Sequence, residues 1–157
     1  MNFNQKLNKI LEYVLVAIMS ILVIDVLWQV ISRYILSSPS SFTDELAGFL
    51  LIWVGMLGAA YVAGRNEHLA IDIVLQRSTG LKKKRLQILI NVIIFMFAFT
   101  VMFIGGTWLV YTRFILEVKS AALQLPLGFV YMVMPISGLL IVYYSVFNLN
   151  LIYKSDK

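Results

Sequence analysis

Four long apolar stretches dominate the sequence and restrict its fold more than any other feature. They cover about residues 10–31, 42–63, 86–116 and 127–152. An α-helix rises about 1.5 Å per residue, so roughly 20 apolar residues suffice to cross a ~30 Å hydrocarbon core. The pattern therefore predicts an all-α integral membrane protein with four transmembrane helices. The third stretch is longer than one perpendicular crossing needs, so we expect tilt or extension beyond the bilayer.

The composition agrees with a chain that is solvated by lipid. Hydrophobic residues make up 61% of the 157 residues and charged residues only 13%, whereas soluble domains have about 45–50% and about 25%. No low-complexity linker divides the chain, so we expect a single membrane domain over residues 1–157. The first stretch is too long for the apolar core of a signal peptide and no small-residue cleavage site follows it, so we expect it to be retained.

The segment between the second and third stretches is amphipathic. His68, Asp72 and Gln76 recur every four residues, with apolar residues between them. This period predicts a short interfacial helix over about residues 66–77. Four basic residues follow, and we expect them to contact lipid headgroups at about 1 kcal/mol per charge; they serve equally well as a stop signal before the third helix. These residues are Lys82, Lys83, Lys84 and Arg85.

The basic residues are distributed unevenly between the two sides of the four helices. Three of the 13 lie on the side opposite the termini, namely Arg33, Arg113 and Lys119. The other ten lie in the tails and in the connection between the second and third helices. The positive-inside rule then predicts that both termini are cytoplasmic, in a bacterial inner membrane. It also accounts for the net charge of +5 without a nucleic-acid partner.

Asp25 is a carboxylate inside the first apolar stretch. A charge there costs several kcal/mol unless it is paired, protonated or in contact with water. Asp25 is therefore either a proton or cation site, or a structural group that hydrogen-bonds a partner helix or lies near the interface.

Two further acids, Asp44 and Glu45, stand at the start of the second helix. Ser41 and Asp44 resemble a capping box, and acids suit the positive end of the helix dipole. Capping explains one carboxylate well. Glu45 either shares this role or pairs with Arg33 or with a basic group of another chain.

The second helix also carries small residues at intervals of about four, together with a tryptophan. Small residues let helices approach closely in lipid, so we expect this set to pack within the chain or against a partner subunit. The set is Gly48, Trp53, Gly55, Gly58, Ala59 and Ala63.

The sequence lacks the residues that catalysis would need. It has no Cys and one His, which excludes thiol chemistry and makes a zinc site improbable. His68 and Asp72 alone are too few ligands for a metal. Because no nucleotide-binding, hydrolase or metalloprotease motif is present, we expect neither an enzyme nor a bound cofactor. Four helices without paired halves also make a poor transport pathway, which favours an accessory part.

An ordered series of short motifs resembles a known family. An Arg33-Tyr34 pair closes the first helix, and Phe42-Thr43-Asp44-Glu45 opens the second. A Gly58-Ala59-Ala60 run, the His68–Asp72 step and the segment from Ala121 to Pro126 follow, with Pro135 in the fourth helix. This series is similar to the small permease (DctQ-type) subunit of tripartite ATP-independent periplasmic (TRAP) transporters. Phe42 and Asp44 depart mildly from the family's Trp and Glu.

The resemblance implies a function and partners. The chain would be the small subunit of a sodium-coupled symporter that imports an organic acid such as sialic acid or a C4-dicarboxylate. It would brace a large multi-helix (DctM-type) permease, where sodium binds, and help dock a periplasmic (DctP-type) binding protein. Arg33, Asp44, Glu45, His68 and Asp72 would be structural polar residues. Docking candidates are Arg33, Ser38, Ser40, Arg113 and Lys119.

The main alternative is a self-sufficient small exporter. A dimer of four-helix chains would exchange protons through an intramembrane acid, and Asp25 is the candidate. Asp25 lies late in the first helix, and no second acid supports this role.

Overall fold

The expected all-helical fold with four long apolar helices is confirmed. A computed structural model describes residues 3–36, 40–65 and 80–154. Four helices in these ranges are long and apolar enough to cross a membrane: Asn4–Tyr34, Ser41–Arg65, Lys82–Ile115 and Leu127–Tyr153. The described residues contain no β-strand beyond one isolated bridge. The segment predicted to form an interfacial helix, with His68 and Asp72, lies outside the described residues, as does Ser38.

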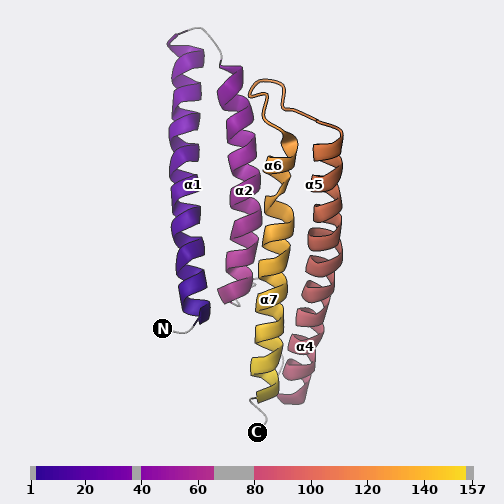
Figure 1. Ribbon diagram of the computed structural model, residues 1–157. Coiled ribbons are helices and arrows are strands. Elements are labelled where there is room, and N and C mark those ends of the chain that lie inside the picture. The colour runs from indigo at the N-terminus through magenta and orange to yellow at the C-terminus, as the bar shows by residue number, and fades with distance from the viewer. Residues whose placement is uncertain (1–2, 37–39, 66–79, 155–157) are drawn as a thin grey trace.

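The helices stand in a row, shown in Figure 1. Helix α1 (Phe3–Tyr34) packs along α2 (Ser41–Arg65), which in turn packs along α7 (Val133–Lys154). Helix α7 also contacts the rod formed by α4 (Gly80–Phe97), the π-helix η1 (Ala98–Gly105) and α5 (Gly106–Ile115). The described chain ends lie together at one end of the row, which we call the terminus end.

The third span is one long rod whose middle is wound as a π-helix. Two glycines allow the rod to approach α7 closely. A Cβ on Gly138 would lie 2.9 Å from the backbone nitrogen of Phe103, and one on Gly106 would lie 3.0 Å from the Met134 Cβ. Small residues at such contacts are the usual means of close helix packing in lipid.

The fourth span is interrupted near its start. Helix α6 (Leu127–Tyr131) ends at Met132, and α7 begins at Val133. Pro135 lies in the first turn of α7, where its missing N–H leaves no intrahelical bond to lose. The kink expected at Pro135 is thus present as a short break just before it.

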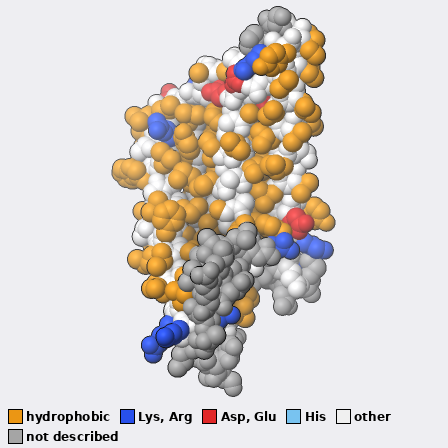
Figure 2. All heavy atoms as spheres, turned by 180° about the vertical axis from the view of Figure 1, so that it is seen from behind, with side chains coloured by type: hydrophobic (Ala, Val, Ile, Leu, Met, Phe, Trp, Pro, Cys, Tyr) orange, Lys and Arg blue, Asp and Glu red, His pale blue; other side chains and the backbone are white. Residues whose placement is uncertain are grey.

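The buried core is small and lies between the helices of the row. One cluster joins Ala60 and Ala63 of α2 to Ala98 and Met102 of η1 and Ile141 of α7. A second joins α1, α2 and α7 around Tyr144. Elsewhere large apolar side chains cover the outside, and Figure 2 shows them spread over the middle of one face, with charged side chains toward its ends. Such a surface is suited to lipid or to a membrane partner.

Candidate functional site

A short hairpin, residues 117–126, joins α5 to α6 at the end of the row opposite the termini. We call this the hairpin end. Helix α5 stops in a Schellman arrangement: the Val118 N–H donates to the Arg113 carbonyl and the Glu117 N–H to the Phe114 carbonyl, both at 3.2 Å. Glu117 takes the left-handed position (φ 46°), which glycine more often fills. Gln124 (φ 54°) makes the second left-handed turn.

Backbone bonds then close the hairpin. The Ser120 N–H donates to the Leu125 carbonyl and the Leu127 N–H to the Val118 carbonyl, each at 2.9 Å. The Ser120 hydroxyl is buried and accepts the Leu125 N–H at 3.2 Å. The hairpin is therefore a defined turn with its own hydrogen bonds.

Glu45 fastens the tip of this hairpin to helix α2. Its carboxylate accepts the backbone N–H groups of Ala121 and Ala122 at 2.9 Å and of Leu123 at 2.7 Å. Successive N–H groups that converge in this way form an anion-binding nest. The negative charge also lies near the positive end of the α2 dipole. The start of the second helix and the entry to the fourth are thus held together by one side chain.

The neighbouring acid, Asp44, has a different partner. Its Oδ1 lies 3.6 Å from Nη2 of Arg33, across the turn from α1 to α2, and both side chains are about half exposed. The two acids therefore divide between two contacts: Asp44 pairs with Arg33, and Glu45 binds hairpin N–H groups. Glu45 therefore does not pair with Arg33, which was one of the alternatives that the sequence left open for it. The Thr43 hydroxyl, buried beside them, donates to the Ser40 carbonyl at 2.9 Å.

The described candidates for docking lie at the hairpin end. Arg33 and Ser40 flank the α1–α2 turn, and Lys119 is exposed on the hairpin. Arg113 differs, because its guanidinium carbon lies 5.9 Å from the centre of the Tyr131 ring and its Nε is buried. At the terminus end, Lys82, Lys83 and Arg85 are exposed at the start of α4, and Lys84 is half-buried.

The small residues of α2 separate onto two sides of the helix. Ala60 and Ala63 are buried in the chain's own core. Trp53 packs against the second cluster, and its indole N–H donates to the Val130 carbonyl in α6 at 3.1 Å. Gly48, Gly55 and Ala59 are exposed on the other side, and a Cβ on Gly48, Gly55 or Gly58 would meet nothing within 4 Å. We call Gly48, Gly55, Gly58 and Ala59 the open side of α2.

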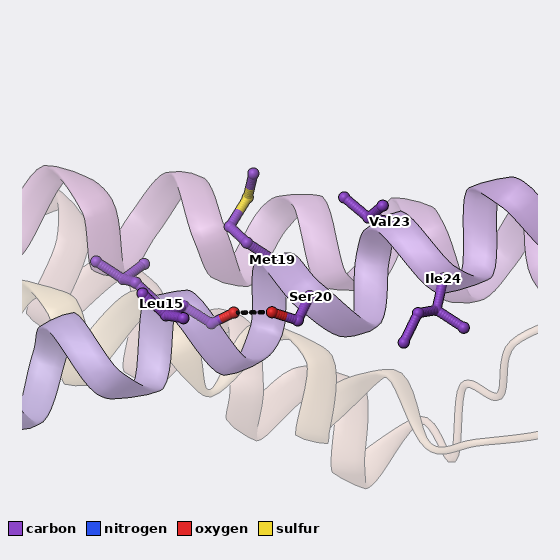
Figure 3. A pocket seen from close by; sticks show the side chains of 6 residues that line it. Leu15, Met19, Ser20, Val23 and Ile24 are labelled. Atoms are coloured by element: carbon purple, nitrogen blue, oxygen red, sulfur yellow. Dashed lines mark hydrogen bonds between the residues drawn. The ribbon is translucent and has the colours of Figure 1, made fainter.

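An apolar groove runs along α1 at a similar height. Figure 3 shows Leu15, Met19, Ser20, Val23 and Ile24 around it, and Val16 completes its lining. The Ser20 hydroxyl is turned back to the Val16 carbonyl at 2.8 Å, so it offers little polarity to the groove. Leu11 of α1 packs with Leu57 of α2, and the two helices are antiparallel. The groove therefore lies at about the level of the open side of α2.

No catalytic arrangement is present in the described part of the chain. Within residues 3–36, 40–65 and 80–154, no group of three His, Asp or Glu side chains could hold a metal ion. Asp25 is buried in α1 at 7% exposure, and its Oδ2 has no hydrogen-bond partner among the described residues. Among the described residues, Asp25 belongs to no group of acidic or histidine side chains that could hold a metal ion.

The bonds from Glu45 to the hairpin and from Trp53 to Val130 are not evident from the sequence. Both join residues 76 to 78 positions apart, beyond the reach of any local pattern. Glu45 and the Ala121–Pro126 segment both stood in the motif series, but a single sequence cannot show that they touch. Correlated substitution at these positions among relatives is the signal that could.

Comparisons with a family model and with individual proteins indicate the same family. The family model for the DctQ component of tripartite ATP-independent periplasmic transporters matches residues 7–153, nearly the whole chain. A Haemophilus influenzae protein described as a TRAP transporter small permease protein is 26% identical over 137 residues, which is 86% of this chain and 82% of that protein.

Two further relatives carry sialic acid in their names. The small permease protein SiaQ of a Vibrio cholerae sialic acid TRAP transporter is 32% identical over 65 residues, 41% of this chain and 38% of that protein. The permease protein SiaT of a Haemophilus influenzae sialic acid TRAP transporter is 29% identical over 102 residues. That match covers 62% of this chain and only 15% of SiaT.

Proposed function

The chain belongs to the DctQ family, the small permease component of TRAP transporters, and from this premise we propose that it braces the large permease subunit and helps to dock the binding protein. As a member it is a multi-pass membrane component of a non-enzymatic transporter, and a TRAP system implies DctM and DctP partners. A role as a self-sufficient exporter that uses Asp25 has no support from this membership.

The bracing role is supported chiefly by the open side of α2. The chain leaves a row of glycines uncovered, where a partner helix could approach the α2 backbone closely. The groove on α1 is further apolar surface that the described chain leaves uncovered. In lipid, helices associate through packing of this kind rather than through the hydrophobic effect. We propose that a helix of the large subunit covers the open side of α2.

The docking role is supported by the hairpin end. Glu45 holds the hairpin tip in one position, and the exposed charges of Arg33 and Lys119 lie at the same end. A rigid, charged surface favours rapid and specific docking of a soluble partner. The proposed orientation, with both termini cytoplasmic, directs this end to the periplasm.

We also propose the substrate class and the coupling ion. Two relatives are named as parts of sialic acid TRAP transporters, and we propose an organic acid such as sialic acid or a C4-dicarboxylate as the solute. Sodium would drive its import through sites in the large subunit.

The experiment that tests the subunit role is co-purification. The tagged full chain is extracted from its native membranes in mild detergent, and the proteins recovered with it are identified by mass spectrometry. We expect one large multi-helix membrane protein in equal amount. Recovery of the chain alone, as a stable dimer, would contradict the bracing role and bring Asp25 back into question.

The docking role has a separate test. Glu45→Gln removes the anion that the three hairpin N–H groups bind, while every positive charge stays in place. We expect the variant to remain in the complex but to take up solute more slowly, because the binding protein docks less often. Glu12→Gln, an exposed acid near the terminus end, is the matched control. Equal uptake by the two variants would remove Glu45 from the docking mechanism.

A further inference from the structure

A small pocket at the hairpin end has the chemistry of an anion site. Its volume is about 300 Å³, and its walls are Arg113, Phe114, Glu117, Lys119 and Pro126. Two cations and one carboxylate therefore face it, which leaves one excess positive charge. The aromatic wall is fixed by the edge-to-face contact of Phe114 with Phe129, whose ring centres are 5.1 Å apart.

Among the residues that line this pocket, Arg113 has a buried hydrogen-bond donor without a partner. Its guanidinium lies near the Tyr131 ring, and among the described residues no acceptor is within hydrogen-bonding distance of its buried Nε. A buried guanidinium N–H is stabilised by an acceptor, and the planar fork of the group matches two oxygens of a phosphate or carboxylate. This arrangement differs from that of Arg33, which is half exposed and paired with Asp44.

The depth of the pocket decides which anion would reach it. Arg113 lies in the last turn of α5 and inside the candidate span Lys82–Ile115. Ile115 and Leu116, two and three residues further along the chain, are 59% and 67% exposed, which suits lipid. Helix α5 also belongs to the outermost rod of the row (Figure 1). The pocket is therefore at the border of hydrocarbon and headgroups, where phosphodiester groups are the abundant anions.

We propose that the Arg113 pocket binds the phosphate group of a phospholipid in the leaflet at the hairpin end. Arg113 would donate to the phosphate oxygens, and the exposed Lys119 would add a second positive charge to the pocket. The headgroup would then anchor α5 and the base of the hairpin at a fixed depth. The site is distinct from the Lys82–Arg85 cluster, which is at the opposite end of the same rod.

The test is lipid binding by the purified, delipidated full chain in uncharged detergent, measured by native mass spectrometry and thermal unfolding. The probes are phosphatidylglycerol, a diacylglycerol with the same acyl chains, and inorganic phosphate. We expect phosphatidylglycerol to bind and to raise the unfolding temperature, and the other two to do neither. Arg113→Gln should weaken phosphatidylglycerol binding about tenfold, the equivalent of one charged hydrogen bond.

Arg33→Gln is the matched control, because it removes the same charge at the same end from an arginine that already has a partner. It should bind phosphatidylglycerol as the unsubstituted chain does. If circular dichroism shows that Arg113→Gln does not fold, Arg113→Lys replaces it; this variant keeps the charge, loses the Nε donor and should bind several-fold more weakly.

Three results would overturn the proposal. The first is unchanged phosphatidylglycerol binding in the folded Arg113 variant. The second is equal binding of diacylglycerol, which would assign the affinity to the acyl chains. The third is equal stabilisation by inorganic phosphate, which would identify a site for soluble anions. None of these results bears on co-purification with a large permease subunit, so this inference and the proposed function can fail separately.

Discussion

The two sides of helix α2 carry the same small residue types in opposite environments. On one side Gly64 is enclosed: a Cβ there would lie 2.7 Å from both Asn8 Oδ1 and the Tyr144 ring. On the other side a Cβ on Gly48, Gly55 or Gly58 would meet nothing within 4 Å. A glycine in a helix interior costs roughly 0.5–1 kcal/mol relative to alanine in water. The enclosed glycine has an evident structural reason, whereas the open ones have none within the described chain.

This difference separates the helix's internal role from the role proposed for it in an assembly. The enclosed side, with Trp53 and Ala60, joins α1 and α7 into one body. The open side is available for a partner. If both sides had been packed within the chain, the small residues would say nothing about a second subunit.

The largest effect on the isolated chain is expected for Gly64→Ala. The new methyl group must displace Asn8 or the Tyr144 ring, whose hydroxyl donates to Asn8 Oδ1 at 2.5 Å. Overpacking of this kind typically costs about 1–3 kcal/mol. The measurement is the unfolding free energy in mixed detergent. A variant as stable as the unsubstituted chain would show that this side of α2 is loosely packed. The contrast between the two sides of the helix would then be wrong.

Trp53→Phe should have a somewhat smaller effect. It keeps most of the buried aromatic surface but removes the indole N–H that binds the Val130 carbonyl across 77 positions of sequence. We expect a loss of about 1 kcal/mol in the same unfolding assay. The matched control is Trp108→Phe, because Trp108 is 69% exposed. Equal losses for the two variants would mean that the Trp53 hydrogen bond contributes nothing.

Arg33→Gln should cost less still. Its ion pair with Asp44 spans 3.6 Å between two half-exposed side chains, and such pairs contribute roughly 0–1 kcal/mol. The loss should shrink as salt is added, because exposed charges are screened. A loss that is large and independent of salt would assign Arg33 a structural role comparable to that of the enclosed side.

Gly55→Leu should have the smallest effect on the isolated chain and a large one on the assembly. The leucine meets open space, so stability should stay within about 0.5 kcal/mol or rise slightly. Co-purification with the large subunit should nevertheless fall sharply, because the side chain prevents close helix approach. Leu51→Ile, at a position 62% exposed on the same helix, is the control. Retention of the partner by Gly55→Leu would place the interface elsewhere.

The four long apolar helices followed from the sequence, because lipid permits few alternatives for long apolar stretches. Pro135 likewise indicated the interruption of the fourth span. The π-helical middle of the third span was not predictable in this way, since its residues are apolar and include no proline. For the hairpin end, the sequence indicated individual residues but not the contacts between them. Asp44 and Glu45 were singled out together, but their different partners depend on how the hairpin folds back onto α2.

The most direct test of the central claim uses the absence of cysteine from the sequence. Gly55→Cys places a single thiol on the open side of α2, and Ile93→Cys, at a position 59% exposed on α4, is the control. A thiol-reactive photo-crosslinker is attached to each variant in native membranes. The account predicts that Gly55→Cys forms a covalent product with one large multi-helix membrane protein and that Ile93→Cys forms little. Crosslinking of Gly55→Cys to lipid alone would contradict it.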